Sequence, residues 1–270
     1  RVRLDEEVVL ITGGAGGLGK SIAQHFGALG ATVVLWDHNL SLLAETRDQL
    51  KNDGIKVEAV FLDLRDKDSI KDCAEHLQKR RDVTVLVNNA GVASVKPLLE
   101  LTDEQISSTF DVNVLSHFHT VRAFLPAMMR RQKGHIITIA SVLSHIGARN
   151  LTDYCSSKAA VSGFHEALAV ELSVTAPAIS TTIVKAATLT TAMFEGTKTP
   201  PGISAIDPED VARAIVDTVL AVSAGCSTTL ILPALFYTWP VYAALPTGVK
   251  VWLMHITGAV QSLSDVTGTQ

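Results

Sequence analysis

The chain has few cysteines and no excess of charge of one sign. Cys73, Cys155 and Cys226 are odd in number and far apart, which argues against a disulfide framework and against a metal site built on paired cysteines. Such a chain is expected in a reducing, intracellular compartment. With 23 Lys and Arg against 27 Asp and Glu, the net charge of -4 provides no basic field for phosphate backbones. We therefore expect neither a metal nor a nucleic acid as partner.

Linkers rich in proline or serine, internal repeats and low-complexity stretches are also missing, so the 270 residues are interpreted as one domain. Short apolar runs alternate with segments of helical period, which predicts repeated βα units. The predicted fold class is α/β: a Rossmann-type, doubly wound sheet of seven parallel strands over residues 1–232, with an apolar C-terminal extension over 233–270. The predicted strands are Val8–Thr12, Thr32–Trp36, Lys56–Leu62, Thr84–Asn88, His135–Ala140, Ser180–Lys185 and Thr228–Leu232.

A glycine-rich turn follows the first predicted strand. It runs from Thr12 to Gly19 and contains Gly13, Gly17 and Leu18, and a helical pattern begins directly after it. Glycines let the backbone approach a pyrophosphate, whose charge is met by free amides and by the helix dipole. The turn therefore predicts a dinucleotide site, with a bare packing turn as the alternative.

The second predicted strand ends next to Asp37, which lies 18 residues after Gly19. A carboxylate at about this distance is expected to accept hydrogen bonds from the adenosine ribose and to repel a 2′-phosphate. No Lys or Arg lies between Gly13 and Gly17 to neutralise such a phosphate. NAD is therefore favoured over NADP. The alternative for Asp37 is a helix N-cap.

Tyr154 and Lys158 lie four residues apart in a helical pattern, so both occupy one face of a helix. An ammonium beside a phenol favours the phenolate, which is the form that takes a proton from an alcohol. Ser141 closes the fifth predicted strand, and Asn113 lies in the helical pattern before that strand. A cation near an aromatic ring is the alternative for the Tyr-Lys pair when it is considered alone.

Five motifs together resemble the short-chain dehydrogenases/reductases: Thr12 to Gly19, Asn88 to Gly91, Asn113, Ser141, and Tyr154 to Lys158. The runs around Asp37 and Tyr154, with the apolar tail, further resemble the 16C subgroup of retinol dehydrogenases and 17β-hydroxysteroid dehydrogenase 11. The resemblance implies that Tyr154 exchanges the proton, Ser141 binds the substrate oxygen, Lys158 lowers the pKa of Tyr154 and holds the nicotinamide ribose, and Asn113 holds a water.

The same resemblance implies further cofactor contacts. It places Asp63 and Leu64 near the adenine, and Asn89, Ala90 and Gly91 along the adenosine ribose; for Asp63 a helix N-cap is an equal alternative. After the sixth predicted strand most members of the family carry Pro-Gly, whereas this chain has Ala186-Ala187. Leu189 and Thr191 are still expected to contact the nicotinamide carboxamide. The replacement is expected to alter how the nicotinamide is held.

The expected substrate pocket is largely apolar, which favours a lipophilic alcohol or carbonyl over a sugar. His145 in it is interpreted as a solvent-facing loop histidine, because Tyr154 already serves as acid and base. The predicted pocket residues are Leu143, His145, Ile146, Leu151, Met193 and Phe194, the last two with core packing as the alternative.

The extension carries a single formal charge, Lys250, between Asp217 and Asp265. Pro233, Pro240 and Pro246 interrupt it, so short helices at a membrane or lipid-droplet surface, or over the substrate entrance, fit better than a spanning helix. The alternatives are a dimer interface or packing on the core. Localisation is expected at the cytoplasmic face of the endoplasmic reticulum, on a lipid droplet, or in the cytoplasm.

The predicted function is NAD(H)-dependent interconversion of a lipophilic alcohol, such as a retinoid, steroid or long-chain lipid, with its aldehyde or ketone. An NADPH-dependent ketoreductase of a biosynthetic pathway is one alternative. A cofactor-binding lipid-surface protein without turnover is another, suggested by Ala186-Ala187. Family members pair through the helices corresponding to Asp103–Arg130 and Asp153–Leu172, which implies a homodimer.

Overall fold

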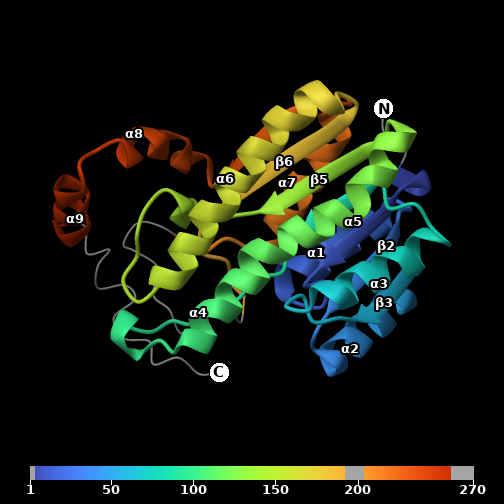
Figure 1. Cartoon of the computed structure of the whole chain (residues 1–270), viewed down its shortest axis with the longest axis horizontal. Coiled ribbons are helices and arrows are strands. Elements are labelled where there is room, and N and C mark those ends of the chain that lie inside the picture. Colours follow the sequence, from blue (N-terminus) through green and yellow to red (C-terminus); the bar gives the residue numbers. More distant parts are fainter. Residues whose placement is uncertain (1–3, 192–203, 257–270) are drawn as a thin grey trace.

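A computed structural model describes residues 4–191 and 204–256. Seven parallel strands form one sheet in the order β3-β2-β1-β4-β5-β6-β7, which confirms the predicted doubly wound architecture (Figure 1). The observed strand ends differ from the predicted ones by at most one residue, and β1 has the predicted bounds. The strands are β1 (Val8–Thr12), β2 (Thr32–Asp37), β3 (Val57–Phe61), β4 (Val85–Asn88), β5 (Gly134–Ile139), β6 (Ile179–Ala186) and β7 (Ser227–Leu232).

Helices cover both faces of the sheet because its strands are apolar on both sides. The core on one face joins β1 and β2 to α1 (Gly17–Ala28), α2 (Leu40–Asn52) and α7 (Pro208–Ala221). The core on the other face joins the same sheet to α3 (Lys67–Gln78), α5 (Ser116–Arg131) and α6 (Thr152–Thr175). Two layers of helix therefore hold the strand ends at fixed positions.

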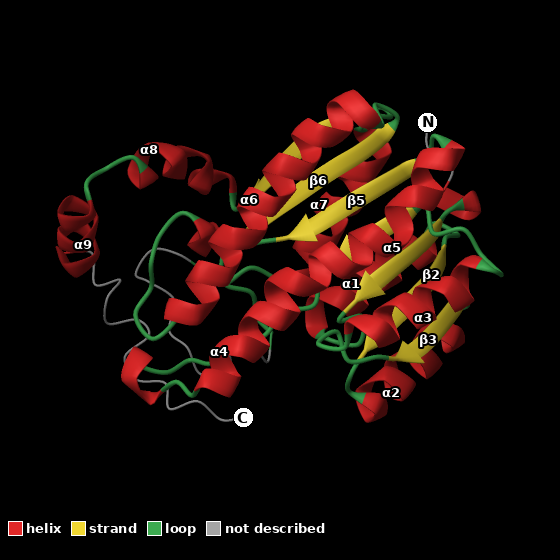
Figure 2. Cartoon of the chain, viewed as in Figure 1, coloured by secondary structure: helices red, strands yellow, loops and turns green. Residues whose placement is uncertain are grey.

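Strands β1 and β4 are neighbours near the centre of the sheet. The chain adds β2 and β3 on the β1 side and β5, β6 and β7 on the β4 side, so the strand order reverses between β1 and β4. In such sheets ligands bind beyond the carboxyl ends of the strands at this switch point. Figure 2 shows the strand arrows running toward the side of the molecule where α4 (Asp103–Phe110) lies. The glycine turn, Asp37, Ser141 and the start of α6 all come at this edge, because each follows the end of a strand or begins a helix there.

The described part of the C-terminal extension, up to Ile256, forms short helices outside the main body in Figure 1: η6 (Ala234–Thr238), α8 (Trp239–Ala243) and α9 (Thr247–Ile256). Phe236 anchors the start of the extension, since it is buried against Val142, Ala187 and Ile231. In the described part of the chain, no helix is long and apolar enough to cross a membrane. Up to Ile256 the extension thus forms short helices, as predicted, and their position at a lipid surface or over the substrate entrance stays a prediction.

Candidate active site

The glycine turn leaves no room for side chains at its tightest point. A Cβ at Gly19 would overlap the carbonyl oxygen of Gly13, and Gly13 itself has a φ of 61°. Helix α1 begins at Gly17, and its N-cap, Gly16, provides no side-chain cap. The first amides of α1 are therefore presented at a helix N-terminus shaped for close backbone approach, which fits a pyrophosphate.

Thr12 and Asn89 connect the glycine turn to the end of β4. The Thr12 hydroxyl accepts hydrogen bonds from the backbone amides of Asn89 (3.0 Å) and Ala90 (3.1 Å). The Asn89 side chain donates to the carbonyl oxygens of Thr12 (2.9 Å) and Gly13 (3.1 Å). Asn89 and Ala90 therefore lie against the turn, and Gly91 follows them; their contact with the adenosine ribose stays a prediction. Thr12 was not among the predicted site residues, although its place before the first glycine was a usable signal.

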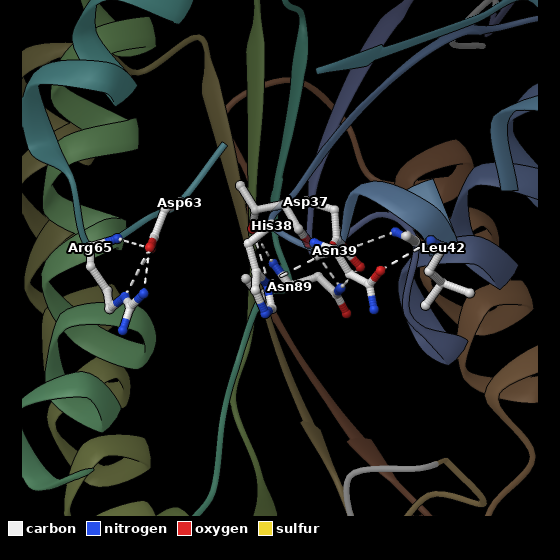
Figure 3. Close-up of polar contacts among 11 residues, drawn as sticks. Asp37, His38, Asn39, Leu42, Asp63, Arg65 and Asn89 are labelled. Atoms are coloured by element: carbon white, nitrogen blue, oxygen red, sulfur yellow. Dashed lines mark hydrogen bonds and ion pairs between the residues drawn. The ribbon is translucent and has the colours of Figure 1, made fainter. Parts of the chain in front are cut away.

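Asp37 is buried at the end of β2 and faces the glycine turn (Figure 3). Its carboxylate accepts hydrogen bonds from the amides of Ala15 (3.0 Å) and Asn39 (2.9 Å). The N-cap of α2 is Asn39, whose side chain accepts from Leu42, so the alternative N-cap role for Asp37 is wrong. A carboxylate at the switch point beside the turn suits the ribose of a dinucleotide.

Asp63 and Arg65 form a bidentate ion pair, separated in Figure 3 from the Asp37 cluster. The Arg65 guanidinium donates hydrogen bonds that hold the pKa of Asp63 below its usual value. The N-cap of α3 is Asp66, so the alternative N-cap role for Asp63 is wrong. Leu64, the other predicted adenine contact, is buried in the core.

Ser141 lies where the ends of β5 and β6 meet. Its hydroxyl donates to the carbonyl oxygen of Ala186 (3.3 Å) and accepts from the amide of Leu143 (3.1 Å). It also hydrogen-bonds Tyr154, which acts to lower the pKa of that phenol. Burial acts in the other direction and is the larger effect, so the pKa of Tyr154 lies above its ordinary value of 10.

Lys158 is buried one helical turn after Tyr154 on α6. Its ammonium donates to the carbonyl oxygen of Ile139 (2.9 Å) and lies 5.6 Å from the centre of the Tyr154 ring. Burial lowers the pKa of Lys158 to about 8. The structure thus places the phenol, the ammonium and Ser141 together, as the sequence predicted.

Asn113 lies in a π-helical segment, η3 (Asp111–Leu115), between α4 and α5. Its side chain accepts from the amide of Val92 (2.8 Å) and donates to the carbonyl of Val92 (2.9 Å) and to the hydroxyl of Ser157 (2.9 Å). π-Helical turns are frequent at functional sites. Here the side chain ties the segment after β4 to α6, next to Tyr154 and Lys158.

The segment after β6 lies beside the glycine turn. Leu189 forms a parallel bridge with Ile206, and a Cβ at Gly17 would lie 2.9 Å from the Cγ2 atom of Thr191. Thr191 is therefore held against the start of α1. Ala186 and Ala187 continue the regular pairing with β7, where the amide of Ala187 donates to Leu232 (2.9 Å).

The predicted pocket residues separate into different environments. Leu143 and Ile146 are half-buried after Ser141, whereas Leu151 is fully buried before α6. His145 does not face solvent as predicted: it is half-buried, and its Nε2 atom lies 3.0 Å from the ammonium of Lys185. The sequence pattern of β6 did not indicate that the Lys185 side chain is buried. Met193 and Phe194 lie outside the described residues.

In the parts of the chain that the structure describes, no group of three or more His, Cys, Asp or Glu side chains is arranged to hold a metal ion.

Comparison with known proteins gives the family. The model of the short chain dehydrogenase family matches residues 7–201. Estradiol 17-beta-dehydrogenase 11 of Macaca fascicularis is 39% identical over 216 residues, covering 79% of this chain and 72% of the relative. Epidermal retinol dehydrogenase 2 of Mus musculus is 39% identical over 219 residues, covering 79% and 71%.

Solved structures agree with this assignment. A metagenomic short-chain oxidoreductase in complex with NADP is 29% identical, with a TM-score of 0.72 over 85% of this chain and 98% of that one. A short-chain dehydrogenase/reductase from Burkholderia phymatum in complex with NAD is 23% identical and shares the fold, with a TM-score of 0.79 over 94% and 97%. The chain therefore belongs to the short-chain dehydrogenase family and is an oxidoreductase acting on CH–OH groups.

Proposed function

We propose that this protein interconverts a lipophilic alcohol and its aldehyde or ketone with NAD(H). The observation that carries the proposal is the convergence of Tyr154, Lys158 and Ser141 at the strand ends next to the glycine turn. Two relatives are named for estradiol and retinol, which are both lipophilic alcohols. The half-buried Leu143 and Ile146 after Ser141 suit such a substrate.

The chain's own residues fit a nicotinamide dinucleotide. The pyrophosphate would lie at the start of α1 on the amides of Gly17, Leu18 and Gly19. Asp37 would accept from the adenosine ribose hydroxyls, and the adenine would lie near Asp63 and Leu64. Asn89, Ala90 and Gly91 would line the ribose, and Leu189 and Thr191 would face the carboxamide. When bound, NAD supplies the acceptor for the substrate's hydride.

Tyr154 and Ser141 would act on the substrate oxygen. In oxidation the Tyr154 phenolate takes the hydroxyl proton, and in reduction the phenol returns it. Ser141 donates a hydrogen bond to the substrate oxygen as negative charge develops there, which requires its hydroxyl to leave the Ala186 carbonyl. Because burial alone raises the pKa of Tyr154, positive charge from Lys158 is needed to stabilise its phenolate. Asn113 would hold a water that links Lys158 to solvent.

Asp37 makes NAD the favoured cofactor, since its buried carboxylate would repel a 2′-phosphate. The Arg65 guanidinium is already engaged by Asp63. The test is a screen of retinol, estradiol and long-chain alcohols, and of their carbonyl partners, with NAD(H) and NADP(H) in parallel. Turnover with NAD(H) that vanishes in Tyr154→Phe supports the proposal. Turnover only with NADP(H) would favour the ketoreductase alternative, and NADH binding without turnover would favour a non-catalytic protein.

We further propose that residues 1–232 form the catalytic domain and that 233–270 form an extension that contacts a lipid surface. Exposed apolar side chains gather on the extension: Tyr237, Val241, Val249, Val251, Trp252 and Ile256. Lys250 turns its ammonium to the carbonyl of Ala243 (3.0 Å), which reduces the cost of bringing this charge near lipid. Such helices suit the interface of an endoplasmic reticulum or lipid-droplet membrane.

Flotation with phosphatidylcholine liposomes tests the lipid contact. The double variant Val241→Glu/Trp252→Glu is expected to stay with the soluble fraction, whereas Leu40→Glu, at a position 65% exposed on α2, is the control and is expected to float. Equal flotation of both variants would refute the contact.

A homodimer is proposed from the exposed apolar side chains on neighbouring helices. Leu115 ends η3, Phe118 lies at the start of α5, and Val170 and Val174 lie on α6. The Phe118 ring packs 4.4 Å from the Phe164 ring, which joins the two helices. Light scattering after gel filtration is expected to give twice the chain mass for the wild type and the chain mass for Phe118→Glu/Val174→Glu.

A further inference from the structure

Lys185 is a buried cation at the end of β6, and nothing in the proposed chemistry uses it. Lys185 is 5% exposed. It directly precedes Ala186, whose carbonyl oxygen accepts a hydrogen bond from the Ser141 hydroxyl. A buried ammonium requires a partner, since an unpaired one is strongly disfavoured. Burial lowers the pKa of Lys185, and the nearby carboxylate of Glu166 on α6 acts to raise it.

The partner is His145, which lies 40 residues away in the sequence. The Lys185 Nζ and His145 Nε2 atoms are 3.0 Å apart. Burial, followed by the positive charge of Lys185, lowers the pKa of His145, and Glu166 opposes this. The imidazole is therefore neutral near pH 7, with Nε2 accepting from the ammonium and the proton on Nδ1.

His145 ends a short turn that begins at Ser141. Within this turn the amide of Ser144 donates to the carbonyl of Ser141 (3.0 Å), and the amide of His145 donates to the carbonyl of Val142 (3.1 Å). The turn is η4 (Val142–Ser144), and the Ser141 side chain is its N-cap. Fixing His145 therefore fixes the far end of the turn that carries Ser141.

The position of the Ser141 hydroxyl depends on the same two segments that Lys185 and His145 join. The hydroxyl is bonded on one side to the Leu143 amide in the turn and on the other to the Ala186 carbonyl at the end of β6. A hydrogen bond from the residue before Ala186 to the end of the turn keeps these segments at one separation. A loss of this separation would move the hydroxyl relative to Tyr154.

We propose that the Lys185–His145 hydrogen bond positions Ser141 for proton and hydride transfer. This role rests on the proposed function, in which Ser141 binds the substrate oxygen. Neither residue touches the reacting atoms in this role: both are positioning residues.

The test uses carbonyl reduction with NADH, because in this direction Tyr154 is needed as the phenol and does not itself impose an acid limb. Retinaldehyde and estrone are the probes, between pH 5 and 8. Lys185→Met and His145→Leu are expected to lower kcat by about tenfold or more, since a displaced hydrogen-bond donor loses part of the 10²–10³-fold effect of such a group. Their dissociation constants for NADH are expected to stay within about twofold of the wild type.

His145→Gln is the matched variant, because its side-chain oxygen accepts from Lys185 but does not titrate. It is expected to keep most of the neutral-pH activity. The wild type is expected to lose kcat as the pH falls through the lowered pKa of His145, because the protonated imidazole repels the ammonium, and His145→Gln is expected to lack this acid limb. His165, the neighbouring α6 histidine, has a pKa lowered to about 4 and titrates below the range.

Each result has one reading. An active wild type with unchanged kcat in Lys185→Met, or an acid limb that persists in His145→Gln, would overturn the positioning role alone. An inactive wild type, or a Tyr154→Phe variant that stays active, would overturn the proposed function and this role with it. Thermal unfolding and NADH binding are measured for every variant, to distinguish a misfolded protein from one in which Ser141 is displaced. An NMR titration of His145 in Lys185→Met is expected to give a higher pKa than in the wild type, because the positive charge of Lys185 is removed.

Discussion

Replacing Gly19 with alanine tests the glycine turn most directly. The added Cβ would overlap the Gly13 carbonyl oxygen and would lie 3.0 Å from the carbon of that carbonyl and 2.9 Å from the Nδ2 atom of Asn89. Neither neighbour can give way freely. The Gly13 carbonyl belongs to the backbone of the turn, and the Asn89 amide holds the turn through two hydrogen bonds.

The expected cost follows from these contacts. Overpacking at a fixed site costs about 1–3 kcal/mol, and each of the two Asn89 hydrogen bonds contributes about 1 kcal/mol. We expect Gly19→Ala to lower the free energy of unfolding by about 3 kcal/mol, which corresponds to a Tm lower by roughly 6 °C for a chain of this size. NADH affinity is expected to fall by about tenfold or more, because the turn must move out of its binding shape.

Gly16→Ala is the control in the same turn. A Cβ at Gly16 has only the Gly13 oxygen as a neighbour, at 3.6 Å, and the φ of -73° is one that alanine adopts. The free energy of unfolding of this variant is expected to fall by less than about 1 kcal/mol, and its NADH affinity is expected to stay close to that of the wild type. Thermal unfolding and NADH fluorescence titration measure both quantities. A Gly19→Ala protein with wild-type Tm and wild-type NADH affinity would refute this account of the turn.

Three other substitutions and one control substitution have defined outcomes. Asp37→Ala is expected to raise the KM for NAD by about tenfold and to lower that for NADP, and steady-state rates with both cofactors would expose an error in the ribose assignment. Lys158→Met is expected to abolish turnover yet to raise the free energy of unfolding by about 2 kcal/mol at pH 7. In the wild type, the shift of the Lys158 pKa from 10.5 in the unfolded chain to about 8 in the folded chain lowers this free energy by roughly 3 kcal/mol, and the variant loses one hydrogen bond of about 1 kcal/mol. Because the unfolded chain binds more protons between pH 8 and 10.5, this difference is complete below pH 8 and vanishes as the pH rises to 10.5. Phe236→Ala is expected to lower the free energy of unfolding by about 3 kcal/mol and to raise the KM for a lipophilic substrate, because Phe236 packs on Val142 next to Ser141. Trp252→Ala, at a position 59% exposed, is the control and is expected to leave both quantities unchanged.

The sequence was sufficient for the features that depend on neighbouring residues. Apolar runs with intervening helical periods predicted all seven strands to within one residue at each end, because burial on both faces of a parallel sheet leaves a continuous apolar pattern. The glycine turn and the i, i+4 placement of Tyr154 and Lys158 are also local. They follow from steric limits on the backbone and from the helical repeat.

Contacts between distant segments were decided by the tertiary structure alone. The Lys185–His145 bond, the Thr12 bonds to Asn89 and Ala90, and the packing of Phe236 on Val142 all join segments that the sheet brings together. Periodicity carries no information about which side chains meet across such an edge. For this reason the sequence alone placed His145 in solvent, whereas the parallel order of β5 and β6 sets it beside a buried lysine.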